Sequence, residues 1–280
     1  MKVAIKTIKG SYHEIAARQF FPNQQRLDIV EESDFETLLD DVVAWKADYW
    51  VIEIENTITG AIYDYLNYLK DKDITIVWEN YIKLEKDLLG LPWTTLSNIK
   101  FACWEHTAIE QTRKTFEKNY PNIKLIECWN LADAWREMKE KNLNHVWLIA
   151  WRLAAKIYGL NILIDKINSD KKNFTRFLLI QAKSKKEEKE FNKATIHIQL
   201  TNQVWSLMKI LSIIAAYEIS LTKIESVPVI WEPFNYSFYI DLNIKNVEYY
   251  HDMIRAITPL IKKLDILGEY EANDKIQTEN

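Results

Sequence analysis

Residues 146–159 read Val-Trp-Leu-Ile-Ala-Trp-Arg-Leu-Ala-Ala-Lys-Ile-Tyr-Gly, and this stretch indicates the fold class. The apolar run 146–150 predicts a buried strand, and residues 151–158 carry apolar side chains at helical spacing. Gly159 follows directly, at a position where glycine commonly ends a helix. A strand that passes straight into a helix is typical of an α/β fold, in which crossover helices connect the strands of a parallel sheet.

The same alternation extends toward the N-terminus. Residues 2–5 predict a strand and residues 12–21 a helix, with Ser11 as N-cap and Glu14 completing a capping box. A second unit repeats the pattern with a strand at 50–54 and a helix at 58–69. Further strands and helices are predicted at 74–78, 99–104, 107–118, 124–128, 131–141 and 173–181.

The chain changes character after residue 182. Residues 183–190 are rich in charge and contain no core residue, which predicts a solvated linker. Beyond it, the order strand, helix, strand, strand, helix, strand predicts a ferredoxin-like βαββαβ unit. Its elements are expected at 195–200, 204–217, 220–229, 236–242, 246–257 and 263–270. We therefore expect one region at 1–182, a linker at 183–193 and a second region at 194–280.

Composition excludes several classes of protein. A length of 280 residues suggests about two domains. The net charge of −4 argues against a nucleic-acid partner, and no apolar run is long enough for a membrane span. Two cysteines, Cys103 and Cys128, suggest a reducing cytoplasm; Cys103 is expected as a buried filler. No spacing predicts a metal site or a cofactor.

Two counts are abnormal. Average usage of about 7% would give roughly 20 glycines, but the chain has 5. It has 11 tryptophans, spread along the whole length. An α/β protein that brings its backbone close to ligands usually needs glycine.

Five motifs occur in order along the chain. They are Gly10-Ser-Tyr-His-Glu-Ile-Ala-Ala-Arg18, Ile54-Glu-Asn-Thr57 with Gly60, Ala154-Ala-Lys-Ile-Tyr-Gly159, Asn173-Phe-Thr-Arg-Phe177 and Leu221-Thr-Lys-Ile-Glu-Ser226. In this order and spacing the chain resembles the prephenate dehydratases with a C-terminal ACT regulatory domain. The resemblance implies a two-lobed catalytic region, like the type II periplasmic binding proteins, followed by the ACT domain. It also implies conversion of prephenate to phenylpyruvate, CO₂ and water, inhibition by L-phenylalanine, and a homodimer or homotetramer.

The retained motifs supply candidate catalytic residues. The substrate loses a carboxylate together with a ring hydroxyl, so a catalyst needs hydrogen-bond donors and a dry cleft. The hydroxyl of Thr57, at the expected start of a helix, is a candidate anion donor. By resemblance Thr175 assists the leaving hydroxyl, and Arg176 supplies a cation. Glu55 and Asn56 belong to the same retained set. Without the resemblance, Thr57 is only an N-cap and Arg176 only a surface ion-pair partner.

Other positions depart from the family pattern. The altered substrate-site positions are Trp104, Glu105 and His106, Asn130 and Leu131, and Trp151. Positions that resemble glycines of the first lobe carry Thr7, Trp50, Trp78 and Trp93. The effector-site positions, which we expect to be blocked, are Trp205, Ser206, Leu207, Glu225, Ser226 and Val227, and Trp231 flanks them.

These changes share a direction, because tryptophan fills space that glycine or serine leaves open. We interpret the chain as a prephenate dehydratase scaffold with a plugged cleft and lost or strongly impaired activity. The pattern also suggests design or deliberate editing. A working prephenate dehydratase is one alternative, supported by the retained threonine and arginine. Another is a binding module of altered specificity, in which the aromatic residues cage a flat or cationic ligand.

Overall fold

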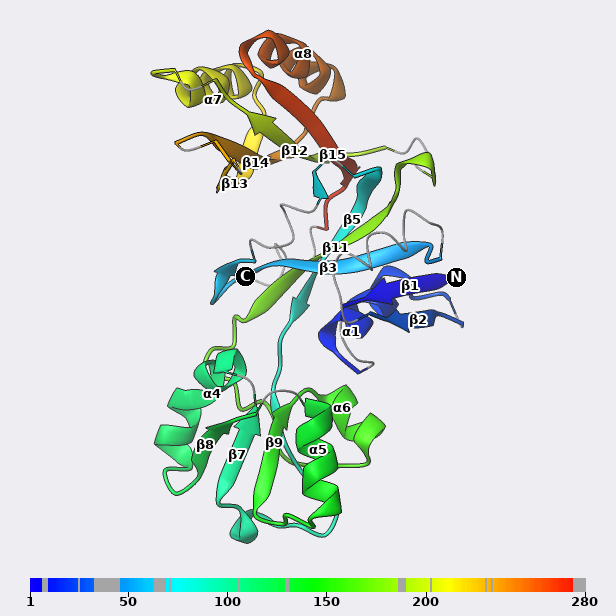
Figure 1. Ribbon diagram of the computed structural model, residues 1–280, viewed down its shortest axis with the longest axis vertical. Helices are drawn as coiled ribbons and strands as arrows, with labels where there is room; N and C mark the ends of the chain where they lie inside the picture. The colour runs from blue at the N-terminus through cyan, green and yellow to red at the C-terminus, as the bar shows by residue number, and fades with distance from the viewer. Residues whose placement is uncertain are drawn as a thin grey trace.

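The computed structural model describes residues 1–6, 10–24, 26–32, 46–62, 69–70, 72–104, 106–128, 131–185, 190–201, 203–229, 231–232 and 234–273. The molecule is elongated and has three parts stacked along its long axis (Figure 1). The C-terminal unit lies at one end, an N-terminal lobe in the middle and a second lobe at the other end. Among the described residues, no helix is both long and apolar enough to cross a membrane.

The N-terminal lobe is built on one twisted sheet. Its strands are β1 (Lys2–Ile5), β2 (Asp28–Glu31), β3 (Tyr49–Asn56), β4 (Gly60–Ala61), β5 (Ile74–Lys83) and β11 (Phe174–Ala182). β1 pairs in parallel with β2 and β3, whereas β11 runs antiparallel between β3 and β5. Helix α1 (Tyr12–Phe20) packs its buried face on this sheet, and Ser11 caps it by accepting from Glu14 N.

The second lobe, formed by residues 87–164, interrupts the first. Its sheet has the order β10 (Asn161–Ile164), β6 (Asp87–Gly90), β9 (Val146–Ala150), β7 (Phe101–Trp104) and β8 (Lys124–Glu127). β7 runs parallel to β8 and β9, as the strand–helix alternation predicts. The helices are α4 (His106–Asn119), α5 (Leu131–Glu140) and α6 (Arg152–Tyr158). Gly159 ends α6 in the left-handed conformation, so this predicted helix end is confirmed.

The C-terminal unit has the predicted βαββαβ order. It comprises β12 (Lys193–Gln199), α7 (Ser206–Ala216), β13 (Ser220–Pro228), β14 (Tyr236–Asn243), α8 (Val247–Ile257) and β15 (Lys263–Glu271). Its strand order, β13-β14-β12-β15, is that of a ferredoxin-like sheet. Three short 3₁₀ turns complete the described elements, at Leu96–Asn98, Lys183–Lys185 and Thr258–Leu260.

The C-terminal sheet continues into the sheet of the N-terminal lobe. β15 pairs in parallel with β5, with Gly268 opposite Ile76, so one sheet of ten strands spans both parts. A Cβ atom on Gly268 would lie 2.4 Å from the Ile76 carbonyl oxygen, so this close approach requires glycine. Of the predicted charged linker, residues 186–189 lie outside the described residues.

Several sequence-based expectations were wrong or incomplete. The helix expected at 58–69 is not present over 58–62, where a turn leads into strand β4, which pairs with the end of β3; residues 63–68 lie outside the described residues. Strands β2, β6 and β10 were not predicted, because each is a four-residue segment without a clear alternating pattern. β5 extends five residues beyond the predicted end at Trp78.

Candidate functional site

Two of the sequence motifs lie side by side. β3 and β11 pair with Asn56 opposite Thr175 and with Glu55 opposite Arg176. The Asn56 amide donates to Thr175 Oγ1 at 2.9 Å and to Asn173 Oδ1 at 2.7 Å. Residues separated by more than a hundred positions are therefore locked together. Thr175 is almost fully buried at the start of β11, just after the chain returns from the second lobe.

Thr57 does not form the predicted anion site. Its hydroxyl donates to the Lys172 carbonyl at 2.8 Å and accepts from Phe174 N at 2.9 Å. The amides of Ile58 and Thr59, which a helix N-terminus would aim at a ligand, both donate to Asn56 Oδ1. The reason is that asparagine closes a local turn with its side chain, which competes with helix initiation. Thr57 therefore fastens the turn to β11.

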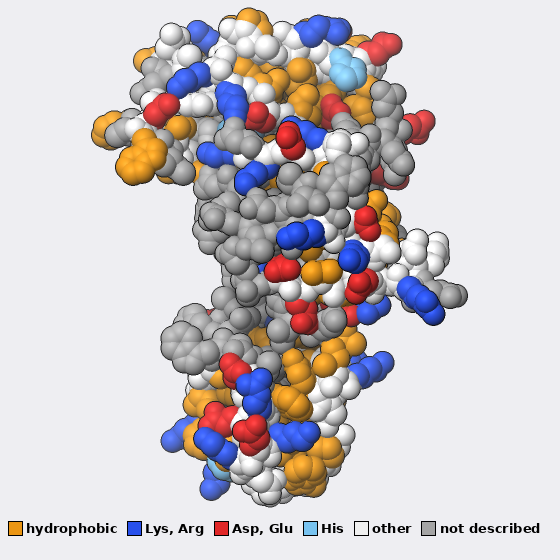
Figure 2. Space-filling view, turned by 45° about the vertical axis from the view of Figure 1, so that its right-hand side comes forward, with side chains coloured by type: hydrophobic (Ala, Val, Ile, Leu, Met, Phe, Trp, Pro, Cys, Tyr) orange, Lys and Arg blue, Asp and Glu red, His pale blue; other side chains and the backbone are white. Residues whose placement is uncertain are grey.

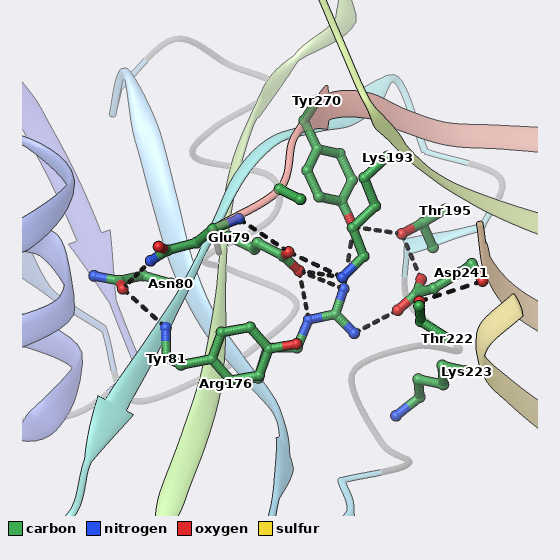
Figure 3. A network of polar contacts seen from close by, with 12 residues as sticks. Glu79, Asn80, Tyr81, Arg176, Lys193, Thr195, Thr222, Lys223, Asp241 and Tyr270 are labelled. Carbon is green, nitrogen blue, oxygen red and sulfur yellow. Dashed lines mark hydrogen bonds and ion pairs between the residues drawn. The ribbon is translucent and has the colours of Figure 1, made fainter. Parts of the chain in front are cut away.

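Arg176 is buried, so its interpretation as a surface ion-pair partner is wrong. Its guanidinium lies at the boundary with the C-terminal unit (Figure 3). Only 1% of the residue's surface is exposed. Nε donates to Glu79 at 2.8 Å, Nη1 pairs with Asp241 and approaches Glu55 at 3.4 Å, and Nη2 donates to Tyr270 Oη at 3.1 Å. Because all these partners are side chains of the protein, the positive charge of Arg176 serves to join β11 to the C-terminal unit.

Each of the three carboxylates around Arg176 has a second donor from the C-terminal unit. These donors are Lys193 for Glu79 at 2.9 Å, Thr195 for Asp241 at 2.6 Å and Lys223 for Glu55 at 2.6 Å. The cations and anions of this network therefore match in number. We call Glu55, Glu79, Arg176, Lys193, Lys223 and Asp241, with Thr195 and Tyr270, the boundary network.

The boundary network shifts the titration of its members. Burial alone would raise the pKa of the Asp241 carboxyl, but Arg176 and Lys193 outweigh it and hold that pKa below its ordinary value. Burial tends to lower the pKa of Arg176, yet Asp241, Tyr270 and Glu79 raise it well above the usual range. Both groups are therefore charged at neutral pH.

A cavity of about 360 Å³ opens beside this network. It is lined by Glu55, Asn56, Thr57, Arg176, Lys223 and Glu225, among others. It thus brings four candidate catalytic residues of the sequence analysis together with one effector-site position. Glu225 was expected in a separate effector site, because no pattern in the sequence indicates that β13 lies near β3 in space.

Aromatic side chains meet where the two lobes touch. Trp104 ends β7 and Trp151 follows β9, and their rings form an edge-to-face pair with centroids 5.2 Å apart. Tyr12 of α1 lies 5.5 Å from the Trp151 ring. Both tryptophans are buried, at 4% and 7% exposed. Within the described residues, neither indole N–H has a hydrogen-bond partner.

Lys86 lies among these rings, although sequence reasoning did not single it out. Its Nζ is 5.0 Å from the Tyr12 ring centroid and 5.6 Å from those of Trp104 and Trp151, and the residue is 4% exposed. The signal in the sequence was a lysine two residues before the apolar run Leu88-Leu89-Gly90-Leu91. We call Tyr12, Lys86, Trp104 and Trp151 the lobe-junction cluster.

The remaining altered positions do not gather in one place. Trp50 is a core residue of the N-terminal lobe, Trp78 packs against Phe20 with 38% exposed, and Trp93 is 61% exposed. Glu105 and Asn130 lie outside the described residues, as does Thr7. His106 and Leu131 are the first residues of α4 and α5.

The effector-site positions are divided between two elements. Trp205 is the N-cap of α7, one residue outside the helix that was predicted to contain it, and it is 66% exposed. Ser206 and Leu207 begin α7, whereas Glu225, Ser226 and Val227 lie on β13. Hydrophobic side chains project from this unit in Figure 2. The described residues therefore leave most of the Trp205 side chain open to solvent.

The two cysteines lie close together in the second lobe. Cys103 is buried, as predicted, and a hydrogen bond with Cys128, together with burial, raises the pKa of its thiol. Within the described ranges, no three His, Cys, Asp or Glu side chains are grouped as metal ligands would be.

Comparison with known proteins identifies the family. The prephenate dehydratase family profile matches residues 3–185. A bifunctional chorismate mutase/prephenate dehydratase of Buchnera aphidicola subsp. Acyrthosiphon pisum is 31% identical over 265 residues, 94% of this chain and 69% of the relative.

Two solved structures share the fold. A prephenate dehydratase of Arthrobacter aurescens in complex with L-Phe has a TM-score of 0.88 and 24% identity, over 98% of this chain and 91% of the other. A protein described as a novel type of quorum quenching acylase has a TM-score of 0.87 and 22% identity, over 99% of this chain and 100% of the other. By its sequence, this chain belongs to the prephenate dehydratase family.

Proposed function

We propose that the chain carries the scaffold for conversion of prephenate to phenylpyruvate, CO₂ and water. In this reaction the bond to the ring carboxylate breaks, and its electron pair completes the aromatic ring. Hydroxide leaves from the opposite ring carbon and becomes water on taking up a proton. Thr175 is our candidate donor to the leaving hydroxide, with its hydroxyl positioned by Asn56 at 2.9 Å.

We further propose that this reaction is lost or strongly impaired. The observation that carries this proposal is the buried edge-to-face pair of Trp104 and Trp151 between the lobes. These rings stand at two positions where the resemblance places small or polar substrate-site residues. A dicarboxylate would have to displace apolar rings that offer it little hydrogen bonding. Deliberate editing of the chain is one origin for such a pattern.

The two alternatives differ in what they require. A working enzyme requires that the lobes open far enough to admit substrate; the retained Asn56–Thr175 contact supports it. A module that cages a cationic ligand requires free aromatic faces. At the lobe junction, the ring faces of Tyr12, Trp104 and Trp151 already surround the chain's own Lys86, which weighs against this alternative.

We propose that the C-terminal unit is an ACT-like domain with a disabled phenylalanine site. Its βαββαβ order supports the first part. Trp205 at the N-cap of α7 supports the second, since an indole there occupies the backbone approach that glycine would leave open. A homodimer or homotetramer and a cytoplasmic location remain proposals by resemblance.

The decisive experiment measures phenylpyruvate formation from prephenate, followed by absorbance in alkali. We expect little turnover by the unmodified chain and measurable turnover by the double variant Trp104→Ser/Trp151→Ser. The variant Trp93→Ser is the matched control, because Trp93 is 61% exposed, whereas Trp104 and Trp151 are buried. Turnover of about 10 s⁻¹ by the unmodified chain, typical of enzymes, would show that the cleft is not blocked.

A second experiment tests the effector site. We expect no heat of binding and no rise in melting temperature with millimolar L-phenylalanine. A ligand at one hundred times its Kd would stabilise the fold by about 2.7 kcal/mol, so even modest affinity is detectable. A dose-dependent rise with L-phenylalanine, absent with D-phenylalanine, would refute the blocked site.

A further inference from the structure

Lys86 occupies a position with the properties of a substrate-binding cation. It lies on the segment that crosses from β5 to β6, between the two lobes. Its neighbours come from both sides, with Tyr12 from the N-terminal lobe and Trp104 and Trp151 from the second lobe. The two tryptophans stand at the carboxyl ends of the parallel strands β7 and β9, the edge where open α/β sheets bind ligands.

We propose that Lys86 binds a carboxylate of the substrate once the rings of Trp104 and Trp151 are removed; this rests on the proposed function. An ammonium surrounded by aromatic faces is attracted to them but remains largely desolvated. A carboxylate that enters in place of the two indoles gains a charge-assisted hydrogen bond from it. The dicarboxylate prephenate suits such a cation.

The test uses prephenate binding by calorimetry in the Trp104→Ser/Trp151→Ser background. Adding Lys86→Met should weaken binding by about tenfold to a hundredfold, whereas Lys86→Arg should retain most of it. Lys83→Met is the control, since Lys83 is exposed and also precedes β6. Circular dichroism verifies that each variant is folded.

The outcomes separate the two proposals. Equal binding by the Lys86→Met and Lys83→Met variants overturns the role of Lys86 and leaves the dehydration proposal standing. Lys86-dependent binding without phenylpyruvate formation keeps Lys86 and overturns the dehydration. A double variant that does not bind prephenate overturns the role of Lys86 as well.

A second inference rests on a different observation, the backbone at two tryptophans. Trp205 has φ 68° and Trp231 has φ 66°, both in the left-handed region that favours glycine. The two side chains are 66% and 95% exposed, so burial does not compensate for the strained backbone. Three of the five glycines also have positive φ. The chain has 11 tryptophans and only 5 glycines, and the backbone at these two positions has a conformation that glycine adopts without strain.

We infer that the codon behind Trp205 and Trp231 is read as glycine in the cell that makes this protein. One codon has different meanings in different genetic codes. Some codes translate it as tryptophan, and others translate it as glycine. This reading explains why tryptophan stands where a glycine conformation is needed, without deliberate editing. If the codons at positions 104 and 151 are also translated as glycine, both indole rings are absent and the lobe junction is open.

Mass spectrometry of the protein purified from its own cells tests this inference directly. Peptides that contain positions 205 and 231 should each be lighter by the difference between tryptophan and glycine. Tryptophan at either position would overturn the inference. In the recombinant chain, Trp205→Gly and Trp231→Gly should raise the melting temperature. Trp135→Gly is the control and should lower it, since Trp135 lies within α5 and donates to the Tyr158 carbonyl.

Discussion

Where the N-terminal lobe meets the C-terminal unit, a sheet continues from β5 into β15 and buried ion pairs cross the boundary. Where the same lobe meets the second lobe, aromatic rings surround one ammonium. Paired charges and strand hydrogen bonds have strict geometry, so the first boundary favours one arrangement. Aromatic contacts are less directional, so the second tolerates movement more easily. The difference teaches that one sheet and one set of ion pairs can hold the C-terminal unit in a single arrangement, whereas the contact between the two lobes has fewer geometric constraints.

The largest effect is expected at the boundary network. Arg176→Met removes the cation from Glu79 and Asp241, which are almost fully buried. Lys193 and Lys223 then remain as two cations for three carboxylates, so one negative charge of the network is left uncompensated. This should lower the free energy of unfolding by about 3–5 kcal/mol, measured by urea denaturation. Arg18→Met is the control: Arg18 is half exposed and pairs with Glu14 one helical turn away. Similar losses in the two variants would contradict the importance of the network.

The next effect concerns the contact that positions Thr175. Asn56→Ala deletes the donor to Thr175 and the acceptor for the amides of Ile58 and Thr59. Buried groups left without partners should cost about 1–3 kcal/mol of unfolding free energy. Asn161→Ala is the control, because Asn161 is exposed and makes one bond to the Pro92 carbonyl; we expect a change within about 0.5 kcal/mol.

A smaller effect is expected at the lobe junction. A double-mutant cycle of Trp104→Leu and Trp151→Leu should give a coupling energy of about 0.5–1.5 kcal/mol, the usual value of an aromatic pair beyond its buried area. A cycle of Trp104→Leu with Trp135→Leu should give coupling near zero, as Trp135 packs on Tyr158 instead. Zero coupling in the first cycle would show that the edge-to-face contact contributes nothing.

The smallest effect is a pH dependence of stability that arises from His13 in the N-terminal lobe and His197 in the C-terminal unit. Burial lowers the pKa of His197 despite its hydrogen bond with Asp265, and burial likewise lowers the pKa of His13. A folded-state pKa below the ordinary value of about 6.5 means that the unfolded chain binds more protons in acid. The stability from these groups is therefore full above that value and is lost as pH falls below it.

Replacement by glutamine tests this dependence in each part. In His197→Gln and in His13→Gln, thermal melts from pH 7.5 to 5 should show a shallower loss of stability than in the parent chain. Because the sheet is continuous from β5 to β15, both variants should affect the same unfolding transition. An unchanged slope in both would show that neither histidine is neutral in the folded state.

The sequence by itself determined the family and the order of most of the helices and strands, but not the short strands β2, β4, β6 and β10. Local signals were sufficient where each element carries its own pattern, as in the apolar strand 146–150, the helix that Gly159 ends, and the C-terminal βαββαβ unit. The motifs around Thr57 and Thr175 identified residues that do lie together, but not the reason for their meeting. A local sequence pattern contains no information on which strands, far apart in the chain, lie next to each other in space.

Only the tertiary structure decided what these residues contact. Asp241 and Glu79 were not singled out in the sequence, although each lies within a strand segment that is rich in apolar residues. Their common partner Arg176 lies on another strand. Asn56 closed a turn where a helix was predicted, because its side chain satisfied the amides a helix would have used. Lys86 became a candidate only when rings from two lobes enclosed it. Burial and charge pairing depend on neighbours that folding brings together, so no stretch of sequence contains them alone.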